Sequence, residues 1–100
     1  RHYVDRGHTV LARRWRGRSG EIDLIVEKDA RISFVEVKTA RNIAQAALSL
    51  RPAQAQRIAR AAQEFLGTRS TGLDTECAFD VGLTDHKGAC EIIENAFFFE

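Results

Sequence analysis

The 100-residue sequence has no methionine, only two cysteines and only three histidines. Cys77 and Cys90 form no Cys-x-x-Cys motif, which argues against a disulfide scaffold and favours a reduced, cytoplasmic protein. The histidines lack the spacing of zinc ligands, which argues against a zinc site. Because no methionine marks a translation start, we expect part of the native N-terminus, including most of a first helix, to be missing.

Long apolar runs and a strong charge of one sign are also absent. No segment has membrane-spanning length and no signal-peptide pattern opens the chain, so we expect no membrane association. Fifteen basic residues against fourteen acidic ones give a net charge of +1, which by itself indicates no nucleic-acid partner. An apolar fraction of 44% in 100 residues suits one globular domain over residues 1–100.

The hydrophobic patterning predicts an α/β fold. Alternation indicates strands over residues 8–15, 21–27, 31–39, 77–83 and 90–99, and spacings of three and four indicate a helix from Pro52 to Leu66. A helical turn should precede Gly7, and residues 40–50 fit either a loop or a short helix. Short turns between the first three strands predict an antiparallel meander, and the helix then allows a crossover to a parallel strand. The expected result is a mixed sheet with helices packed on it.

The second and third predicted strands carry an unusual set of charges. Alternation places Ile22 on the face opposite to Glu21, Asp23 and Ile25. With the turn centred between residues 29 and 30, the facing pairs are Ile25 and Phe34, Asp23 and Glu36, and Glu21 and Lys38. Like charges that face each other across two strands are destabilising. Either a solvated ion-pair cluster containing Glu21 and Lys38 relieves this conflict, or a cation such as Mg²⁺ does, which binds one or two protein carboxylates.

Several stretches resemble one nuclease superfamily in the same order along the chain. They are "GHTVLARRWRGRSGEIDLI", "FVEVKT", "QRIARAA", "FDVG" and "IENAF". Together they resemble the PD-(D/E)XK core, and most of all the uncharacterised bacterial YraN-like proteins, which are related to Holliday-junction resolvases. The resemblance implies a restriction-endonuclease-like fold. It also implies a metal-dependent DNA endonuclease that acts on branched or structured DNA, and a possible homodimer.

The resemblance also implies roles for individual residues. Asp23 and Glu36, with the backbone carbonyl of Val37, would bind Mg²⁺ or Mn²⁺, and Lys38 would activate the attacking water. Glu21 would be a further carboxylate of the site. Gln54 would lie near it, although an exposed glutamine in the first turn of the helix is an equal alternative. Two other functions stay open: a non-catalytic nucleic-acid-binding module, and a structural protein whose hairpin is an ion-pair cluster.

Arginines cluster upstream of Glu21, in "RRWRGR", and recur later in the chain. Their phosphate contacts would be independent of sequence and sensitive to salt. The candidates for binding nucleic acid are Arg13, Arg14, Arg16, Arg18, Arg41 and Arg57. Trp15, inside the cluster, would either stack on an unpaired base or pack into the protein.

Overall fold

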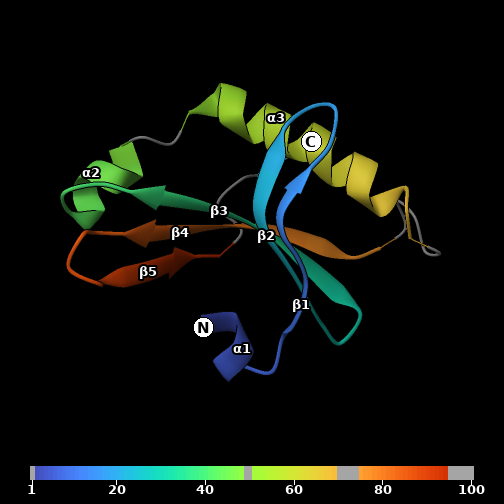
Figure 1. The fold of residues 1–100 in the computed structure, drawn as a ribbon, viewed down its shortest axis with the longest axis horizontal. Helices are drawn as coiled ribbons and strands as arrows, with labels where there is room; N and C mark the ends of the chain where they lie inside the picture. The colour runs from blue at the N-terminus through green and yellow to red at the C-terminus, as the bar shows by residue number, and fades with distance from the viewer. Residues whose placement is uncertain (1, 49–50, 70–74, 95–100) are drawn as a thin grey trace.

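The computed structural model describes residues 2–48, 51–69 and 75–94, which contain a five-stranded mixed sheet. The strands are β1 (Thr9–Arg16), β2 (Glu21–Lys28), β3 (Arg31–Thr39), β4 (Cys77–Thr84) and β5 (Cys90–Ile93), and they lie side by side in that order (Figure 1). Only the β3–β4 pair is parallel among the pairs of this sheet. The predicted α/β fold, with a meander followed by a crossover, is therefore confirmed. The predicted last strand extends beyond β5 into residues 95–99, which lie outside the described residues.

Three described helices flank the sheet: α1 (His2–Asp5), α2 (Ile43–Leu48) and α3 (Pro52–Leu66). The bounds of α3 match the prediction. Proline fits the first turn because the N–H that it lacks has no partner inside a helix. Gly7, with a φ of 89°, follows α1 in the left-handed conformation that glycine adopts most easily. Residues 40–50, which fitted either a loop or a short helix, contain α2.

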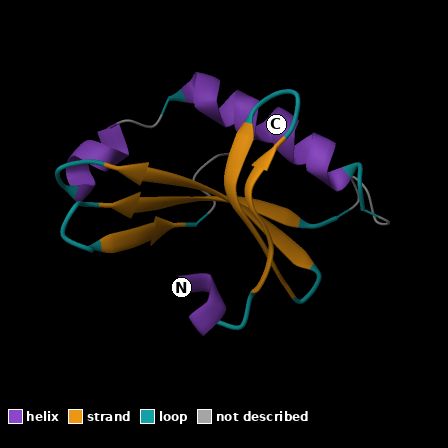
Figure 2. Ribbon diagram, viewed as in Figure 1, coloured by secondary structure: helices purple, strands orange, loops and turns teal. Residues whose placement is uncertain are grey.

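Helix α1 covers one face of the sheet and helix α3 covers the other (Figures 1 and 2). Ile25 and Phe34 pack with Phe65 of α3 in one core cluster. Val35, the neighbour of Phe34 on β3, packs with Tyr3 of α1 in another cluster. Successive residues of a strand point to opposite faces, so β3 supplies both cores.

The side chains of β2 do not alternate as strictly as predicted. Ile22 lies in the same core cluster as Ile25, although an odd separation of three residues should place them on opposite faces. The neighbouring strand is irregular at the same level: Arg14 has a φ of 49° and lies between the pairs Arg13–Leu24 and Trp15–Ile22. The prediction for Ile22 is therefore wrong, because both strands kink where the charged end of the hairpin begins.

Tyr3 binds a buried carboxyl group on the α1 face of the sheet. Its hydroxyl donates a hydrogen bond of 2.7 Å to Asp80 Oδ2, and Asp80 is 4% exposed. Burial, and then this bond, raise the pKa of Tyr3. We expect Tyr3→Phe to lower the free energy of unfolding by about 1–2 kcal/mol, because the ring still packs while the buried carboxyl loses a donor. Urea denaturation measures this loss; a change within about 0.5 kcal/mol, as for surface substitutions, would contradict it.

Candidate active site

The hairpin of β2 and β3 has the predicted register but opens at its charged end. Ile25 faces Phe34, and the backbone pairing ends with Leu24 and Val35. Beyond that point the Asp23 carboxylate takes over, since its Oδ2 accepts a 2.7 Å hydrogen bond from the Val37 N–H. Asp23 is thus held on β3 by a side-chain contact rather than by the backbone pairing of two strands.

The carboxyl groups of Asp23 and Glu36 lie against each other. Burial of Glu36 raises its pKa to about 7; the hydrogen bond to Asp23 and the negative charge of Asp23 add to this effect. The positive charges of Lys38 and Arg57 act in the opposite direction. Near pH 7 Glu36 is therefore only partly ionised, and the predicted conflict between like charges is present in the folded protein.

A hollow of about 560 Å³ opens at this end of the hairpin. Acidic groups and a lysine from β2 and β3 come together in its wall with arginines from β1, the following turn and α3. The lining residues are Arg16, Gly17, Arg18, Ser19, Gly20, Glu21, Asp23, Glu36, Val37, Lys38 and Arg57. It therefore unites both predicted metal-binding carboxylates with Val37, Lys38, Glu21 and three of the predicted phosphate-binding arginines.

Glu21 has a different partner from the one considered in the ion-pair alternative. It forms a salt bridge of 3.2 Å with Arg16, which faces it across the β1–β2 pair. Among the described residues, no salt bridge joins Glu21 to Lys38. The side chain of Arg16 is 80% exposed, so this pair adds little to stability and its guanidinium remains accessible to a phosphate.

Some of the predicted site residues lie outside the hollow. The wall includes none of Gln54, Arg13, Arg14 and Arg41, and the three arginines are exposed elsewhere. Gln54 Oε1 is buried and has no hydrogen-bond partner among the described residues, so the glutamine is not the exposed alternative. Trp15 packs edge-on against Phe65, with ring centroids 5.6 Å apart, which makes it part of the core.

The turn between β1 and β2 has a structural role that was not predicted from the sequence. Gly17, Ser19 and Gly20 form part of the wall, and Glu64 of α3 binds the turn from outside the hollow. The signal in the sequence was the glycine-flanked "GRSG", since glycine permits the close approach of another segment. Nothing local indicated Glu64, which lies 45 residues from Ser19.

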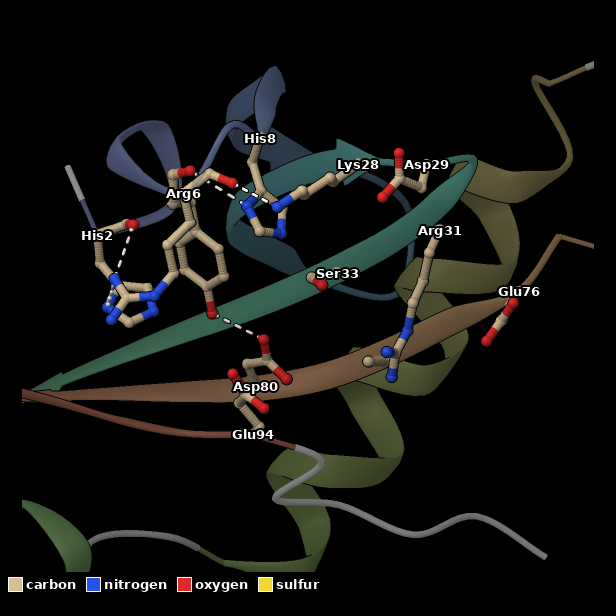
Figure 3. Close-up of a pocket in the computed structure, with 12 residues that line it drawn as sticks. His2, Arg6, His8, Lys28, Asp29, Arg31, Ser33, Glu76, Asp80 and Glu94 are labelled. Carbon is tan, nitrogen blue, oxygen red and sulfur yellow. Dashed lines mark hydrogen bonds between the residues drawn. The ribbon is translucent and has the colours of Figure 1, made fainter.

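A second hollow, of about 420 Å³, lies on the α1 face of the sheet (Figure 3). It contains basic and acidic side chains in close mixture, and several of them already have partners. Tyr3 binds Asp80, and Lys28 Nζ donates a 2.6 Å hydrogen bond to the Arg6 carbonyl. Because the Asp80 carboxyl group is buried and held by Tyr3, and because basic and acidic side chains nearly balance in the lining, this hollow is less suited to binding a phosphate backbone than the first.

The donor set of the first hollow fits a hard divalent cation. No three His, Cys, Asp or Glu side chains in the described ranges group as a ready-made metal site, so Asp23 and Glu36 are two donors rather than a full cage. Mg²⁺ is commonly bound by one or two carboxylates while it keeps several waters. Burial, and then the neighbouring Asp23, raise the pKa of Glu36, and a cation bound between the two carboxylates would offset both effects.

None of the three described helices combines the length and the apolar character needed to span a bilayer.

Comparisons with known proteins give the family. The sequence profile of uncharacterised protein family UPF0102 matches residues 1–83. A UPF0102 protein of Ruegeria pomeroyi is 50% identical over 97 residues, which cover 97% of this chain and 79% of the relative. UPF0102 proteins of Roseobacter denitrificans and Cereibacter sphaeroides are 44% and 50% identical, over 96% and 97% of this chain and 74% and 83% of theirs. The predicted YraN-like relationship is confirmed: the chain belongs to uncharacterised protein family UPF0102.

Proposed function

We propose that this protein is a metal-dependent nuclease that hydrolyses phosphodiester bonds in DNA, with branched or structured DNA as its substrate. One observation carries the proposal: two carboxyl groups in contact, Asp23 and Glu36, lie in one hollow with Lys38 and with arginines of three segments. The acidic pair suits a cation, and the arginines around it suit a phosphate backbone.

Asp23 and Glu36 would hold Mg²⁺ or Mn²⁺, with the Val37 carbonyl as a further ligand. A bound cation of this kind lowers the pKa of a water molecule and balances the negative charge that develops on the phosphate. The Val37 N–H fixes the Asp23 carboxylate, so one donor is oriented in advance. Glu36, whose pKa is raised to about 7, must be ionised before both carboxylates can bind.

Lys38 would act on the water and the phosphate. It follows Glu36 by two residues on β3 and lines the same hollow, so its ammonium group would lie beside the reacting groups. There it would orient the attacking water and stabilise negative charge on the phosphate oxygens. Arg16, Arg18 and Arg57 would bind neighbouring phosphates of the same strand.

Calorimetric titration of the intact protein with Mn²⁺ at pH 8 tests the proposal. We expect a single site in the wild type, and binding weakened at least about tenfold in Asp23→Asn and in Glu36→Gln, because each change removes a charged oxygen donor. Asp29→Asn is the matched control, since this exposed carboxylate lies at the opposite end of the same hairpin. The same samples are then incubated with flap, four-way-junction and duplex DNA.

Metal binding that is lost in both variants, together with metal-dependent cleavage, would support the nuclease. Salt-sensitive DNA binding without cleavage would instead support the alternative of a non-catalytic nucleic-acid-binding module. If the wild type and the variants bound Mn²⁺ equally poorly, the hairpin would be an ion-pair cluster and the proposal would be wrong.

A further inference from the structure

The turn between β1 and β2 is fastened to α3 by one carboxylate. Glu64 Oε2 accepts a 2.7 Å hydrogen bond from the Arg18 N–H, and Oε1 accepts bonds of 3.0 and 2.8 Å from the Ser19 N–H and hydroxyl. Three donors of the turn thus converge on a single side chain. Hydrogen bonds to an ionised carboxylate are shorter and stronger than neutral ones, and the bond from Ser19 lowers the pKa of Glu64, which keeps it ionised.

A second contact joins the same turn to the same face of α3. Arg57 precedes Glu64 by seven residues, which is about two helical turns. A Cβ atom on Gly20 would lie 2.8 Å from Arg57 Cγ, so the stem of the arginine lies against the glycine backbone. A Cβ atom on Gly17 would collide with Glu64 Oε2 and would lie 2.8 Å from the Trp15 ring. A side chain at either glycine would therefore displace the Glu64 or Arg57 side chain that contacts the turn.

The fastened turn forms one wall of the hollow that contains Asp23 and Glu36. A Gly-Arg-Ser-Gly hairpin tip has few contacts of its own and would sample many conformations if it were free. Its backbone closes with a 2.9 Å hydrogen bond from the Gly17 N–H to the Gly20 carbonyl, but nothing in that bond aims the turn at the hollow. The contact with Glu64 sets the direction of the turn, because the core residues of α3 fix that helix on the sheet.

The turn held by Glu64 places the side chain of Arg18 in the wall of the hollow. This side chain is exposed, and its guanidinium forms no ion pair with another described residue. Glu64 holds the backbone N–H of Arg18 and so fixes the base of that side chain. A guanidinium in a fixed position binds a phosphate with a smaller loss of conformational freedom than a mobile one.

We propose that Glu64 is a positioning residue for DNA: it holds the 17–20 turn so that Arg18 meets a backbone phosphate next to the one at the carboxylate pair. This inference rests on the proposed function, because it assumes that the hollow receives a DNA strand. Glu64 itself touches neither metal nor DNA and acts only through the turn.

Binding of a fluorescent DNA junction to the intact protein, followed by anisotropy in EDTA at several salt concentrations, tests the inference. We expect Glu64→Ala to weaken binding about three- to tenfold and to lower the slope of log Kd against log salt concentration by about one, the signature of one lost phosphate contact. Mn²⁺ affinity at pH 8 should stay within twofold of the wild type. Gln63→Ala, at an exposed position next to Glu64 on α3, is the matched control and should change neither quantity.

Two further variants separate positioning from general damage. Gly17→Ala disturbs the same contact from the turn and should weaken DNA binding in the same way. The effect should be smaller in the Glu64→Ala background, where the collision with Glu64 is gone and only the close approach to the Trp15 ring remains. Glu64→Gln keeps the shape of the side chain but turns one acceptor into a donor that faces N–H groups. If Glu64→Ala does not fold, Glu64→Gln should show the weaker DNA binding and the lower salt slope in its place.

The outcomes distinguish this inference from the proposed function. DNA binding that depends on Glu64 in a protein that neither binds Mn²⁺ nor cleaves would support the inference and overturn the nuclease. A metal-dependent nuclease whose Kd and salt slope are unchanged in Glu64→Ala and Glu64→Gln would overturn the inference alone. A wild type that binds no DNA would overturn both.

Discussion

Lys38→Ala should lower the rate of metal-dependent DNA cleavage by about 10²- to 10⁴-fold, the range for removal of a group that assists proton transfer or stabilises developing charge. Lys38 lines the hollow that holds the two carboxyl groups, and it is the lysine of that wall; every other cation there is an arginine. An ammonium group on β3 is suited to orienting a water molecule, whereas the arginines are suited to holding phosphates. The loss should therefore appear in the rate constant of cleavage more than in the affinity for DNA.

The pH of this experiment matters because Lys38 also acts on Glu36. Its positive charge holds the pKa of Glu36 below the value that burial and Asp23 would otherwise produce. Removal of the lysine raises that pKa further, so near pH 7 the variant would also bind Mn²⁺ more weakly. Single-turnover cleavage at pH 8 or above, with saturating Mn²⁺, separates the catalytic loss from this indirect effect.

Lys28→Ala provides the matched control. It removes the same charge from the last residue of β2, where Lys28 pairs with Arg31 at the far end of the hairpin. Cleavage should stay within about threefold of the wild type, since Lys28 does not line the hollow. If both lysine variants lost activity equally, a general effect of charge on DNA binding would explain the loss, and the catalytic role of Lys38 would be wrong.

The sequence was sufficient for the elements whose signals are local. The period of α3, with Pro52 at its start and Gly67 after its end, predicted its bounds. The register of β2 and β3 followed from pairing Ile25 with Phe34, because a slip by one residue would expose one of two residues that are buried in the structure. The same register predicted that Asp23, Glu36 and Lys38 would lie at one end of the hairpin, although the structure holds Asp23 there through the Val37 N–H rather than through strand pairing.

What the sequence could not predict depends on contacts between distant segments. The kink that moves Ile22 onto the same face as Ile25 arises where β2 separates from β3 and Asp23 binds a backbone N–H instead. The contact of Glu64 with Ser19 spans 45 residues and depends on how α3 crosses the sheet. No periodicity or turn rule encodes such a distance, because those rules describe neighbours along one element.

Metal-free protein should lose stability as pH rises, and its affinity for Mn²⁺ should increase over the same range. Glu36 has a folded-state pKa of about 7, above its ordinary value of 4.5, so the folded protein binds more protons than the unfolded chain between these two pH values. The free energy of unfolding therefore falls as pH rises from about 4.5 to about 7. Because Glu36 is partly exposed, solvent screening reduces the effect to on the order of 1 kcal/mol.

Mn²⁺ competes with the proton on the carboxyl pair, so below about pH 7 its affinity should rise about tenfold for each pH unit and then level off. Between pH 5 and pH 7 this amounts to about a hundredfold, with release of about one proton per bound ion. Calorimetry in buffers of different ionisation enthalpy measures that proton directly.

Glu36→Gln is the decisive variant for the stability half of this prediction. A glutamine keeps the size of the side chain and can still donate a hydrogen bond to Asp23, as the protonated glutamate does, but it cannot ionise. Urea denaturation in EDTA should therefore show that the wild type loses stability relative to the variant as pH rises from 5 to 8, a comparison that cancels the opposite contribution of His2, whose pKa burial lowers in both proteins. The same dependence of stability on pH in the wild type and in the variant would mean that Glu36 is ionised in the folded state without metal. The two carboxylates would then already be compensated by Lys38 and Arg57, and the negative charge that the proposed cation site requires would be absent.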